Sequence, residues 1–229
     1  MTRVTKLAAL AAELDAAGLA ARGGFHPGES DRVPPLADGR AVATLVLVGV
    51  IGARQWQAFA ASPERADGTP HPLDRWSRRV IRPIAERHGA EALYPFDGPP
   101  WHPFQRWAQR AEPVHVSPLG ILIHPDWGLW HAYRGALAFA GPLDLPPRDR
   151  RPSPCDSCRE RPCLSRCPVG AITAAGFEVR TCRAHLAAPE GAGCVAEGCL
   201  ARRACPVGTA HRYPAAQAEF HMQAFKRGA

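Results

Sequence analysis

The 229-residue chain lacks the short motifs that mark several common enzyme classes. It has no Walker-type phosphate loop, no Gly-x-Gly-x-x-Gly run and no His-Glu-x-x-His pair, which argues against nucleotide-loop and zincin chemistry. Its longest apolar run, residues 41–51, is too short to span a bilayer. Residues 1–21 carry Lys6, Glu13 and Asp15 and no cleavage-type signal, and no twin-arginine leader is evident. We therefore expect a cytoplasmic protein in a reducing compartment, where free thiols persist.

All eight cysteines lie in the last third of the chain. They form two groups that each end in Cys-Pro-Val-Gly, at residues 167–170 and 205–208, which indicates an internal duplication. Thiolates are soft ligands that suit iron–sulfur clusters, and eight of them make two sets of four. Zinc and disulfides remain alternatives. A zinc ribbon uses four cysteines in two close pairs and does not explain the repeated ending, while a disulfide framework is typical of small secreted domains.

The spacing resembles that of bacterial two-cluster ferredoxins, in which the fourth cysteine of a C-x2-C-x2-C-x3-C-P run binds the other cluster. The gap after Cys158 and the gaps in the second group are wider than in that pattern. The resemblance implies two [4Fe–4S] clusters. The crossover implies one ligand set of Cys155, Cys158, Cys163 and Cys205, and a second set of Cys167, Cys182, Cys194 and Cys199. Cys182 stands alone in the sequence, where the ferredoxin pattern has a member of a tight group. This variation resembles the ferredoxin module of epoxyqueuosine reductases.

The formal charge of +7 raises the question of a nucleic-acid partner. Residues 148–229 carry 13 Lys and Arg against 7 Asp and Glu. Clusters held by four thiolates each would add negative charge that this count ignores. We therefore interpret the arginines mainly as balancing the clusters or facing an acidic, low-potential electron donor of the ferredoxin or flavodoxin type, and a nucleic-acid partner is not favoured.

The first two thirds of the chain mix helical and strand patterns without a βαβ repeat, which predicts an α+β domain. We expect helices over residues 7–17, 53–61, 73–84 and 104–111, with Pro83 kinking or splitting the third. We expect a loop over residues 23–35 and strands over residues 42–51, 91–96, 114–123 and 130–139, the last two joined by a turn at residues 124–128. A proline-rich linker then places the boundary near Pro147, giving domains 1–147 and 148–229.

Residues 117–135 read SPLGILIHPDWGLWHAYRG. An ordinary hairpin with Trp127 and Trp130 in its core accounts for the pattern. The stretch also resembles the signature of CblC-type cobalamin-processing chaperones, in which Gly-x-x-Ile-His-Pro leads through an aromatic-Gly turn to Trp and then Arg-Gly. The matching residues are Gly120, Ile123, His124, Pro125, Trp127, Gly128, Trp130, Arg134 and Gly135. Looser similarity at residues 71–74 and 144–147 extends it over most of residues 1–147.

This resemblance implies a nitroreductase-like α+β fold that holds cobalamin with its lower base detached. In that family the Gly-x-x-Ile strand lies against the corrin face, and the matching arginine places an anionic thiol co-substrate or the cofactor. Arg134 is then the candidate catalytic residue, and a structural ion pair is its alternative role. The candidate cofactor-binding residues are Ser117, Leu119, Gly120, Ile121, Leu122, Ile123, His124, Trp130 and Arg134.

The chain also departs from the chaperone pattern. The aromatic stretch that precedes the motif in that family is short or missing between Arg110 and Ser117, which puts a flavin site in doubt. No Asp-x-His-x-x-Gly motif supplies a lower cobalt ligand. A ferredoxin-like tail joins a corrinoid domain in epoxyqueuosine reductases and reductive dehalogenases, which are more distantly similar.

Together these features predict an iron–sulfur corrinoid protein, an oxidoreductase that reduces bound cobalamin and removes its upper ligand. One alternative is a cobalamin-dependent reductase of the epoxyqueuosine type. Against it, the acid aspartate of that family has no equivalent here, and the nearby acid is Glu112. The other alternative is a ferredoxin-type electron carrier without a corrinoid.

Overall fold

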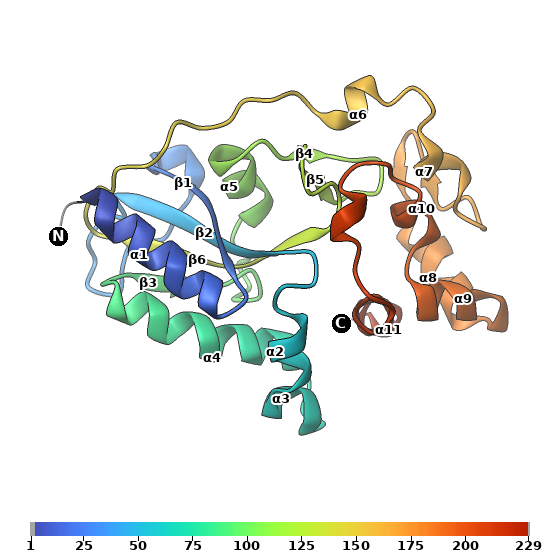
Figure 1. Cartoon of the computed structure of the whole chain (residues 1–229), viewed down its shortest axis with the longest axis horizontal. Helices are drawn as coiled ribbons and strands as arrows, with labels where there is room; N and C mark the ends of the chain where they lie inside the picture. Colours follow the sequence, from blue (N-terminus) through green and yellow to red (C-terminus); the bar gives the residue numbers. More distant parts are fainter. Residues whose placement is uncertain (1–2, 229) are drawn as a thin grey trace. The chain divides into compact units, whose positions relative to one another are not determined.

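The computed structural model describes residues 3–228 and divides into two compact units, whose elements are labelled in Figure 1. The first unit comprises Met1–Glu112 and Ala132–Arg150, and the second comprises Pro113–His131 and Arg151–Ala229. The division after Arg150 lies close to the predicted boundary at Pro147. Residues 113–131, however, belong to the cysteine-bearing unit and not to the unit that precedes it. Most of the motif at residues 117–135 therefore belongs to the same unit as the cysteines.

A four-stranded sheet with the order β1-β2-β6-β3 forms the centre of the first unit. β1 pairs with β2 and β3 pairs with β6, both antiparallel. Seven of the eight residues of β2 are buried, as the apolar, β-branched run at residues 42–51 predicts. The strands are β1 (Ala20–Phe25), β2 (Thr44–Ile51), β3 (Glu91–Leu93) and β6 (His131–Phe139).

Helices pack against this sheet at the positions that the apolar spacing predicts. α1 and α5 contact β1, and α4 contacts β3. Their bounds are α1 (Arg3–Ala16), α2 (Trp56–Ala60), α3 (Pro63–Ala66), α4 (Pro72–Arg87) and α5 (Phe104–Ala111). α4 is not split at Pro83. It loses one backbone hydrogen bond there, but the buried Ile81, Ile84 and Ala85 on either side hold it in the core. No helix among residues 3–228 has the length and apolar content needed to cross a membrane.

The predicted loop over residues 23–35 is wrong at its start, because β1 runs through Gly23 and Gly24. Local chemistry favours a turn at a Gly-Gly pair, so the sequence hides this strand. The contacts explain the glycines. A Cβ on Gly23 would lie 2.7 Å from the carbonyl oxygen of Ala111 at the end of α5, and one on Gly24 would lie 2.8 Å from the carbonyl oxygen of Leu45 in β2. Close packing against α5 and β2 therefore sets the composition of β1.

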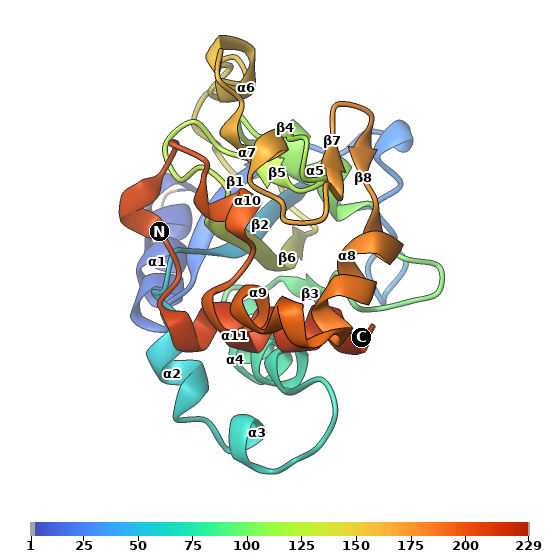
Figure 2. The same ribbon diagram turned by 90° about the vertical axis from the view of Figure 1, so that its right-hand side faces the viewer.

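The second unit consists of short helices and two small hairpins. The strands are β4 (His115–Val116), β5 (Leu122–Ile123), β7 (Ile172–Thr173) and β8 (Gly176–Phe177). α11 contacts both α8 and α9 (Figure 2). The helices are α6 (Pro154–Ser157), α7 (Pro162–Ser165), α8 (Val179–Ala187), α9 (Ala192–Glu197), α10 (Leu200–Arg203) and α11 (Ala215–Arg227).

The single strand predicted over residues 114–123 is instead the hairpin β4–β5. A tight turn separates the two strands, with the amide of Gly120 donating to the carbonyl of Ser117 at 2.9 Å and Gly120 at φ +72°. Ser-Pro-x-Gly is a turn sequence, with Ser first, Pro second and Gly fourth. The apolar residues on both sides of this turn made it resemble one continuous strand.

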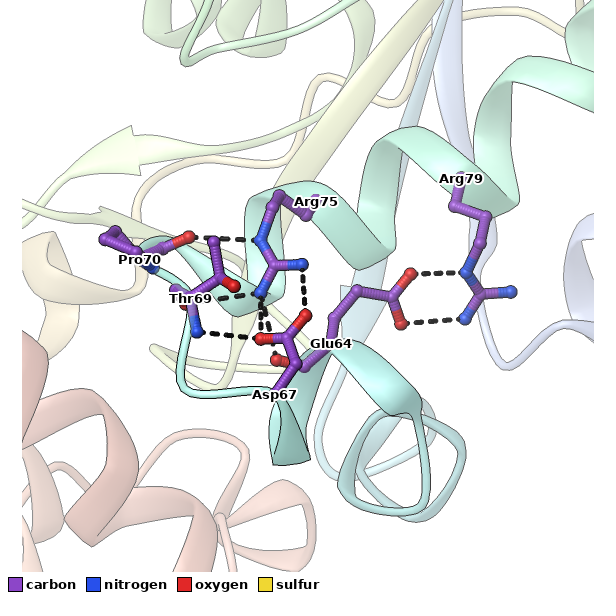
Figure 3. A network of polar contacts seen from close by, with 6 residues as sticks. All are labelled: Glu64, Asp67, Thr69, Pro70, Arg75 and Arg79. Carbon is purple, nitrogen blue, oxygen red and sulfur yellow. Dashed lines mark hydrogen bonds and ion pairs between the residues drawn. The ribbon is translucent and has the colours of Figure 1, made fainter.

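A network of ion pairs joins α3 to the beginning of α4 (Figure 3). The guanidinium of Arg75 donates to both carboxylate oxygens of Asp67 at 2.7 Å and also to the carbonyl oxygens of Glu64, Thr69 and Pro70. Arg79, one turn further along α4, pairs with the carboxylate of Glu64. The hydrogen bonds from Arg79 lower the pKa of Glu64 to about 2, and those from Arg75 lower the pKa of Asp67 to about 2. Both acids, Glu64 in α3 and Asp67 just after it, are therefore held ionised by arginines of α4.

Acid should weaken this network within a defined pH window. Because both pKa values are depressed in the folded state, the contribution to stability is complete above the unfolded values of about 4.5 and 3.8 and is lost as the pH falls towards about 2. We expect urea midpoints to fall less between pH 5 and pH 3 in the double variant Glu64→Gln, Asp67→Asn than in the parent protein. The exposed Glu29, changed to Gln, is the control and should leave the slope unchanged. Equal slopes in all three proteins would contradict the prediction.

Candidate metal centre and its surroundings

Short helices and the loops between them carry the eight cysteines. Cys155 and Cys158 lie in and just after α6, where the side chain of Ser153 accepts a hydrogen bond from the amide of Cys155. Cys163 lies in α7 and Cys167 follows it, while Cys182 lies in α8 and Cys194 in α9. Cys199 caps α10 at its N-terminus and Cys205 follows that helix. All eight are free thiols.

The electrostatic interactions among the thiols sort them into two groups. The neighbours that raise the pKa of Cys205 include Cys155, Cys158 and Cys163. Those that raise the pKa of Cys182 include Cys167, Cys194 and Cys199. The cysteines that raise the pKa values of Cys155 and Cys163 also come from the first group. Those that raise the pKa values of Cys194 and Cys199 come from the second group. Each group has the same members as one of the ligand sets that the ferredoxin crossover implies, and the assignment of ligands to clusters stays a prediction.

Burial is the main cause of the raised thiol pKa values. It raises the pKa of Cys182 to about 11 and also raises the pKa of Cys155, Cys163, Cys194, Cys199 and Cys205. Without a metal these thiols stay protonated near neutral pH. Binding a soft metal centre would therefore release protons and gain affinity as the pH rises.

Within residues 3–228, no group of three or more His, Cys, Asp or Glu is arranged to hold one metal ion. A zinc ion at about 2.3 Å from each sulfur brings its four thiolates to within about 4 Å of one another. A [4Fe–4S] cluster binds its thiolates at four separate iron corners and keeps them further apart. Thiolates are soft donors, and their chemistry suits zinc and iron–sulfur clusters alike.

A cavity of about 400 Å³ opens beside the first group of cysteines. Cys155, Cys158, Cys163 and Cys205 all line it, and so does Arg161. The opposite wall comes from the β4–β5 hairpin and includes Val116, Ser117, Gly120 and Ile123. The segment predicted to contact a corrin therefore also forms part of the surroundings of this thiol group.

The predicted cofactor-binding residues of this hairpin are partly buried in the core of the unit and partly exposed at the turn. Leu119 and Ile123 are 6% and 2% exposed and pack in one apolar cluster with Ile172, Ala201 and Cys205. Gly120 and Ile121 are exposed at the turn. A Cβ built on Gly120 would lie 3.9 Å from the Cβ of Phe177, which is an ordinary contact and leaves space at the turn. Ser117 is buried and donates to the carbonyl of Ile121 at 2.7 Å, which holds the turn, and Leu122 is buried.

The aromatic-Gly turn after β5 is anchored to the second Cys-Pro-Val-Gly sequence. The buried ring of His124 stacks on Trp127 at 3.8 Å between ring centroids, and its Nδ1 accepts from the amide of Asp126 at 3.0 Å. A Cβ on Gly128 would overlap the carbonyl oxygen of Val207, and one on Gly208 would overlap the carbonyl group of Trp127. The sequence motifs show both glycines, but nothing local indicates that they touch.

Arg134 lies on β6 and belongs to the first unit. Its Nη2 donates to Asp74 at 3.2 Å, and its side chain is 15% exposed. Asp74 lies in the first turn of α4 and belongs to the segment at residues 71–74 that resembles the chaperone family. The ion pair with Asp74 accounts for the position of the Arg134 side chain. Part of this side chain is still exposed.

Glu112 is locked in a buried network that the sequence did not reveal. Nε and Nη2 of Arg22 donate to its carboxylate at 3.2 and 3.1 Å, and the hydroxyl of Tyr133 donates at 2.7 Å. Arg22 is 1% and Glu112 6% exposed. Burial raises the pKa of Glu112 despite the nearby guanidinium. Its carboxylate is committed to internal partners.

No protein-family model matches the chain, and no curated protein sequence matches it. Solved structures do. A B12-trafficking protein CblC from C. elegans, a human MMACHC homologue, has a TM-score of 0.54 at 14% identity, over 97% of this chain and 96% of that one. Epoxyqueuosine reductase from Streptococcus thermophilus has a TM-score of 0.53 at 13% identity, over 93% and 68%. The Bacillus subtilis enzyme gives 0.52 at 13%, over 93% and 69%. The chain therefore shares a mixed α/β fold with both kinds of protein.

Proposed function

We propose that this chain is an iron–sulfur corrinoid protein that binds cobalamin with its lower base detached, reduces it, and thereby removes its upper ligand. The observation that carries the proposal is the placement of the β4–β5 hairpin. Gly120 and Ile123, from the Gly-x-x-Ile segment that resembles the corrin-contacting strand of CblC-type chaperones, line the same cavity as Cys155, Cys158, Cys163 and Cys205. The neighbouring residues 116–118 line it too. The four thiols would hold an electron-transfer centre at the same cavity that Gly120 lines. Fold likeness to CblC and epoxyqueuosine reductase supports the proposal without determining the substrate.

In this proposal the two thiol groups hold two [4Fe–4S] clusters, which supply low-potential electrons one at a time. Cys155, Cys158, Cys163 and Cys205 hold one, and Cys167, Cys182, Cys194 and Cys199 hold the other. Amide donors tune the sulfurs, as the amide of Ala171 does at 3.2 Å from Sγ of Cys167. The exposed Gly120 gives a planar ligand close access to the backbone. Arg134 orients an anionic part of the cobalamin or of a co-substrate.

The metal content provides the first test. Protein reconstituted anaerobically should contain about eight iron and eight sulfide per chain. Cys158→Ser should lose about half of both, and Cys182→Ser the other half, because the two residues belong to different groups. The double variant should retain neither cluster. Stoichiometric zinc without sulfide would end the iron–sulfur proposal.

Corrinoid binding provides the second test. Adding aquo- or methylcobalamin should shift the visible spectrum to the base-off form, because no lower-ligand histidine motif is present. Gly120→Asp should abolish the shift, since a charged side chain would enter where the backbone approaches the ring. Gly170→Asp is the matched control. Gly170 also has positive φ, at +62°, and beyond its chain neighbours no atom of residues 3–228 lies within 4 Å of a built Cβ. A cofactor spectrum that stays base-on at saturating parent protein would refute the site.

A cobalamin-dependent reductase of the epoxyqueuosine type is the second candidate, favoured by the fold likeness to two such enzymes. The argument against this candidate concerns the acid that would donate a proton to the substrate. Glu112, the acid nearest in sequence, is buried and bonded to Arg22 and Tyr133, so it is poorly placed to serve a substrate. A tRNA-dependent reduction assay separates the two candidates. An electron carrier without a corrinoid is separated by the cobalamin titration.

A further inference from the structure

A second cavity of about 400 Å³ lies within the cysteine-bearing unit, beside the second thiol group. Cys199 and residues of α10 line one side, and residues of α11 and the loop before it line the other. The lining is rich in cations and aromatic rings. It includes Trp130, Arg202, Arg203, Arg212, Tyr213 and His221, with Glu197 as its acid.

Two of the three arginines in this cavity have no carboxylate partner among residues 3–228. Arg203 pairs with Glu197 at 2.9 Å. Arg202 donates only to the carbonyl of Leu129, and Arg212 only to the carbonyl of Arg203 at 2.7 Å. Within residues 3–228, no carboxylate lies within ion-pair distance of Arg202 or Arg212. The guanidinium of Arg202 is half-buried, lying 4.6 Å from the ring centre of Trp130 and 4.5 Å from that of Tyr213. A desolvated cation of this kind favours an anion nearby.

Two buried donors at the cavity wall also lack acceptors. Trp130 is 3% exposed, and its Nε1 has no hydrogen-bond partner among residues 3–228. The same is true of Nε of Arg202. Both groups can only donate, so each requires an oxygen or another acceptor. Unpaired buried donors are rare in folded proteins and call for an explanation.

We propose that this cavity binds a small molecule that carries an oxyanion, either a phosphate or a carboxylate group. Arg202 and Arg212 supply the charge, the indole of Trp130 supplies a neutral donor, and Tyr213 supplies an apolar wall. The site lies apart from the β4–β5 hairpin and goes beyond the proposed function. Trp130, which the motif at residues 117–135 predicted to contact the corrin, lines this second cavity and not the first. Because Cys199 lines the same cavity, a reduced cluster there would repel the bound anion, so reduction should weaken binding.

The experiment is an anaerobic calorimetric titration of the full-length protein with inorganic phosphate, phenyl phosphate and benzoate, with sodium chloride at matched ionic strength as the blank. We expect saturable binding of one of the three at one site per chain. Arg212→Gln should weaken it by about tenfold or more, because a charge-assisted hydrogen bond is lost. Arg227→Gln removes the same charge from an exposed position at the end of α11 and should leave the affinity unchanged.

Trp130→Phe provides the second variant, because it keeps an aromatic ring beside Arg202 and removes the N–H donor together with part of the indole. It should weaken binding and leave the iron and sulfide content intact. Absence of saturable binding in cluster-loaded protein would overturn the inference, and the arginines would then only balance the charge of the cluster. Equal weakening by Arg212→Gln and Arg227→Gln would overturn it too. Iron and sulfide measured on the same samples report separately on the proposed function.

Discussion

Replacing Cys205 with Ser is expected to leave cobalamin binding intact and to abolish cobalt reduction by a ferredoxin-type donor. Cys205 is 8% exposed and packs in the apolar cluster with Leu119 and Ile123 of the hairpin. Serine is nearly the same size, so the packing should persist. Its oxygen is a hard and less readily ionised ligand, which iron–sulfur chemistry does not favour. The rate of donor-dependent reduction should fall by about tenfold or more, since even the outer partners of metal ligands have effects of that size.

A chemical bypass separates electron delivery from damage to the corrinoid site. A small titanium(III) or viologen reductant can reach bound cobalamin directly, so it should reduce the Cys205→Ser and parent proteins at similar rates. Arg134→Ala should show the opposite pattern, with clusters intact and upper-ligand removal slowed under both reductants. If Cys205→Ser still reduced cobalt at the parent rate with the ferredoxin-type donor, the thiol groups would be structural or would serve another partner.

These two variants probe different parts of one proposed arrangement. The low end of the range for protein-bound clusters is about −700 mV, and detaching the lower base of cobalamin removes an electron-donating ligand. Both effects make reduction of cobalt easier. The first thiol group and the β4–β5 hairpin line the same cavity. In the proposed arrangement, electron transfer from cluster to cobalt would therefore occur within one chain and would not need an encounter between two molecules.

The sequence predicted the elements that apolar periodicity defines. β2, α1, α5 and β6 lie where the patterns placed them, because each buries one continuous face or both faces of its own residues. It failed where a distant contact sets the local conformation. β1 contains Gly23 and Gly24 because α5 and β2 leave no space for side chains there.

The candidate site shows the same limit. Cysteine spacing and the motif at residues 117–135 were visible as patterns, and the ferredoxin resemblance implied the two groups in which the thiols interact. The sequence placed the hairpin with the first domain, however, and the structure groups residues 113–131 with the cysteines. Pairs such as Arg202 with Trp130, or Arg134 with Asp74, join residues far apart in the chain. No local spacing encodes them.

The two Cys-Pro-Val-Gly sequences should respond very differently to the same substitution. Both glycines have positive φ, +62° for Gly170 and +68° for Gly208. Alanine at either position costs about 1–2 kcal/mol of conformational strain. Around Gly170, no atom in the described part of the chain lies within 4 Å of a built Cβ apart from the adjoining residues, so no further cost arises. At Gly208 the new methyl group would overlap the backbone of Trp127, and the backbones must separate.

Gly208→Ala should therefore lower the free energy of unfolding by about 2–5 kcal/mol, the sum of strain and overpacking. Gly170→Ala should lower it by about 1–2 kcal/mol. Gly128→Ala, on the other side of the same contact, should behave like Gly208→Ala, since its Cβ would overlap the carbonyl oxygen of Val207. Anaerobic urea unfolding of the three variants, with iron content measured before and after, checks the ranking. Because Cys205 precedes this contact by three residues, Gly208→Ala should also release iron more readily than Gly170→Ala. Equal stabilities for Gly170→Ala and Gly208→Ala would show that the contact between residues 128 and 208 does not hold the hairpin beside the cysteines.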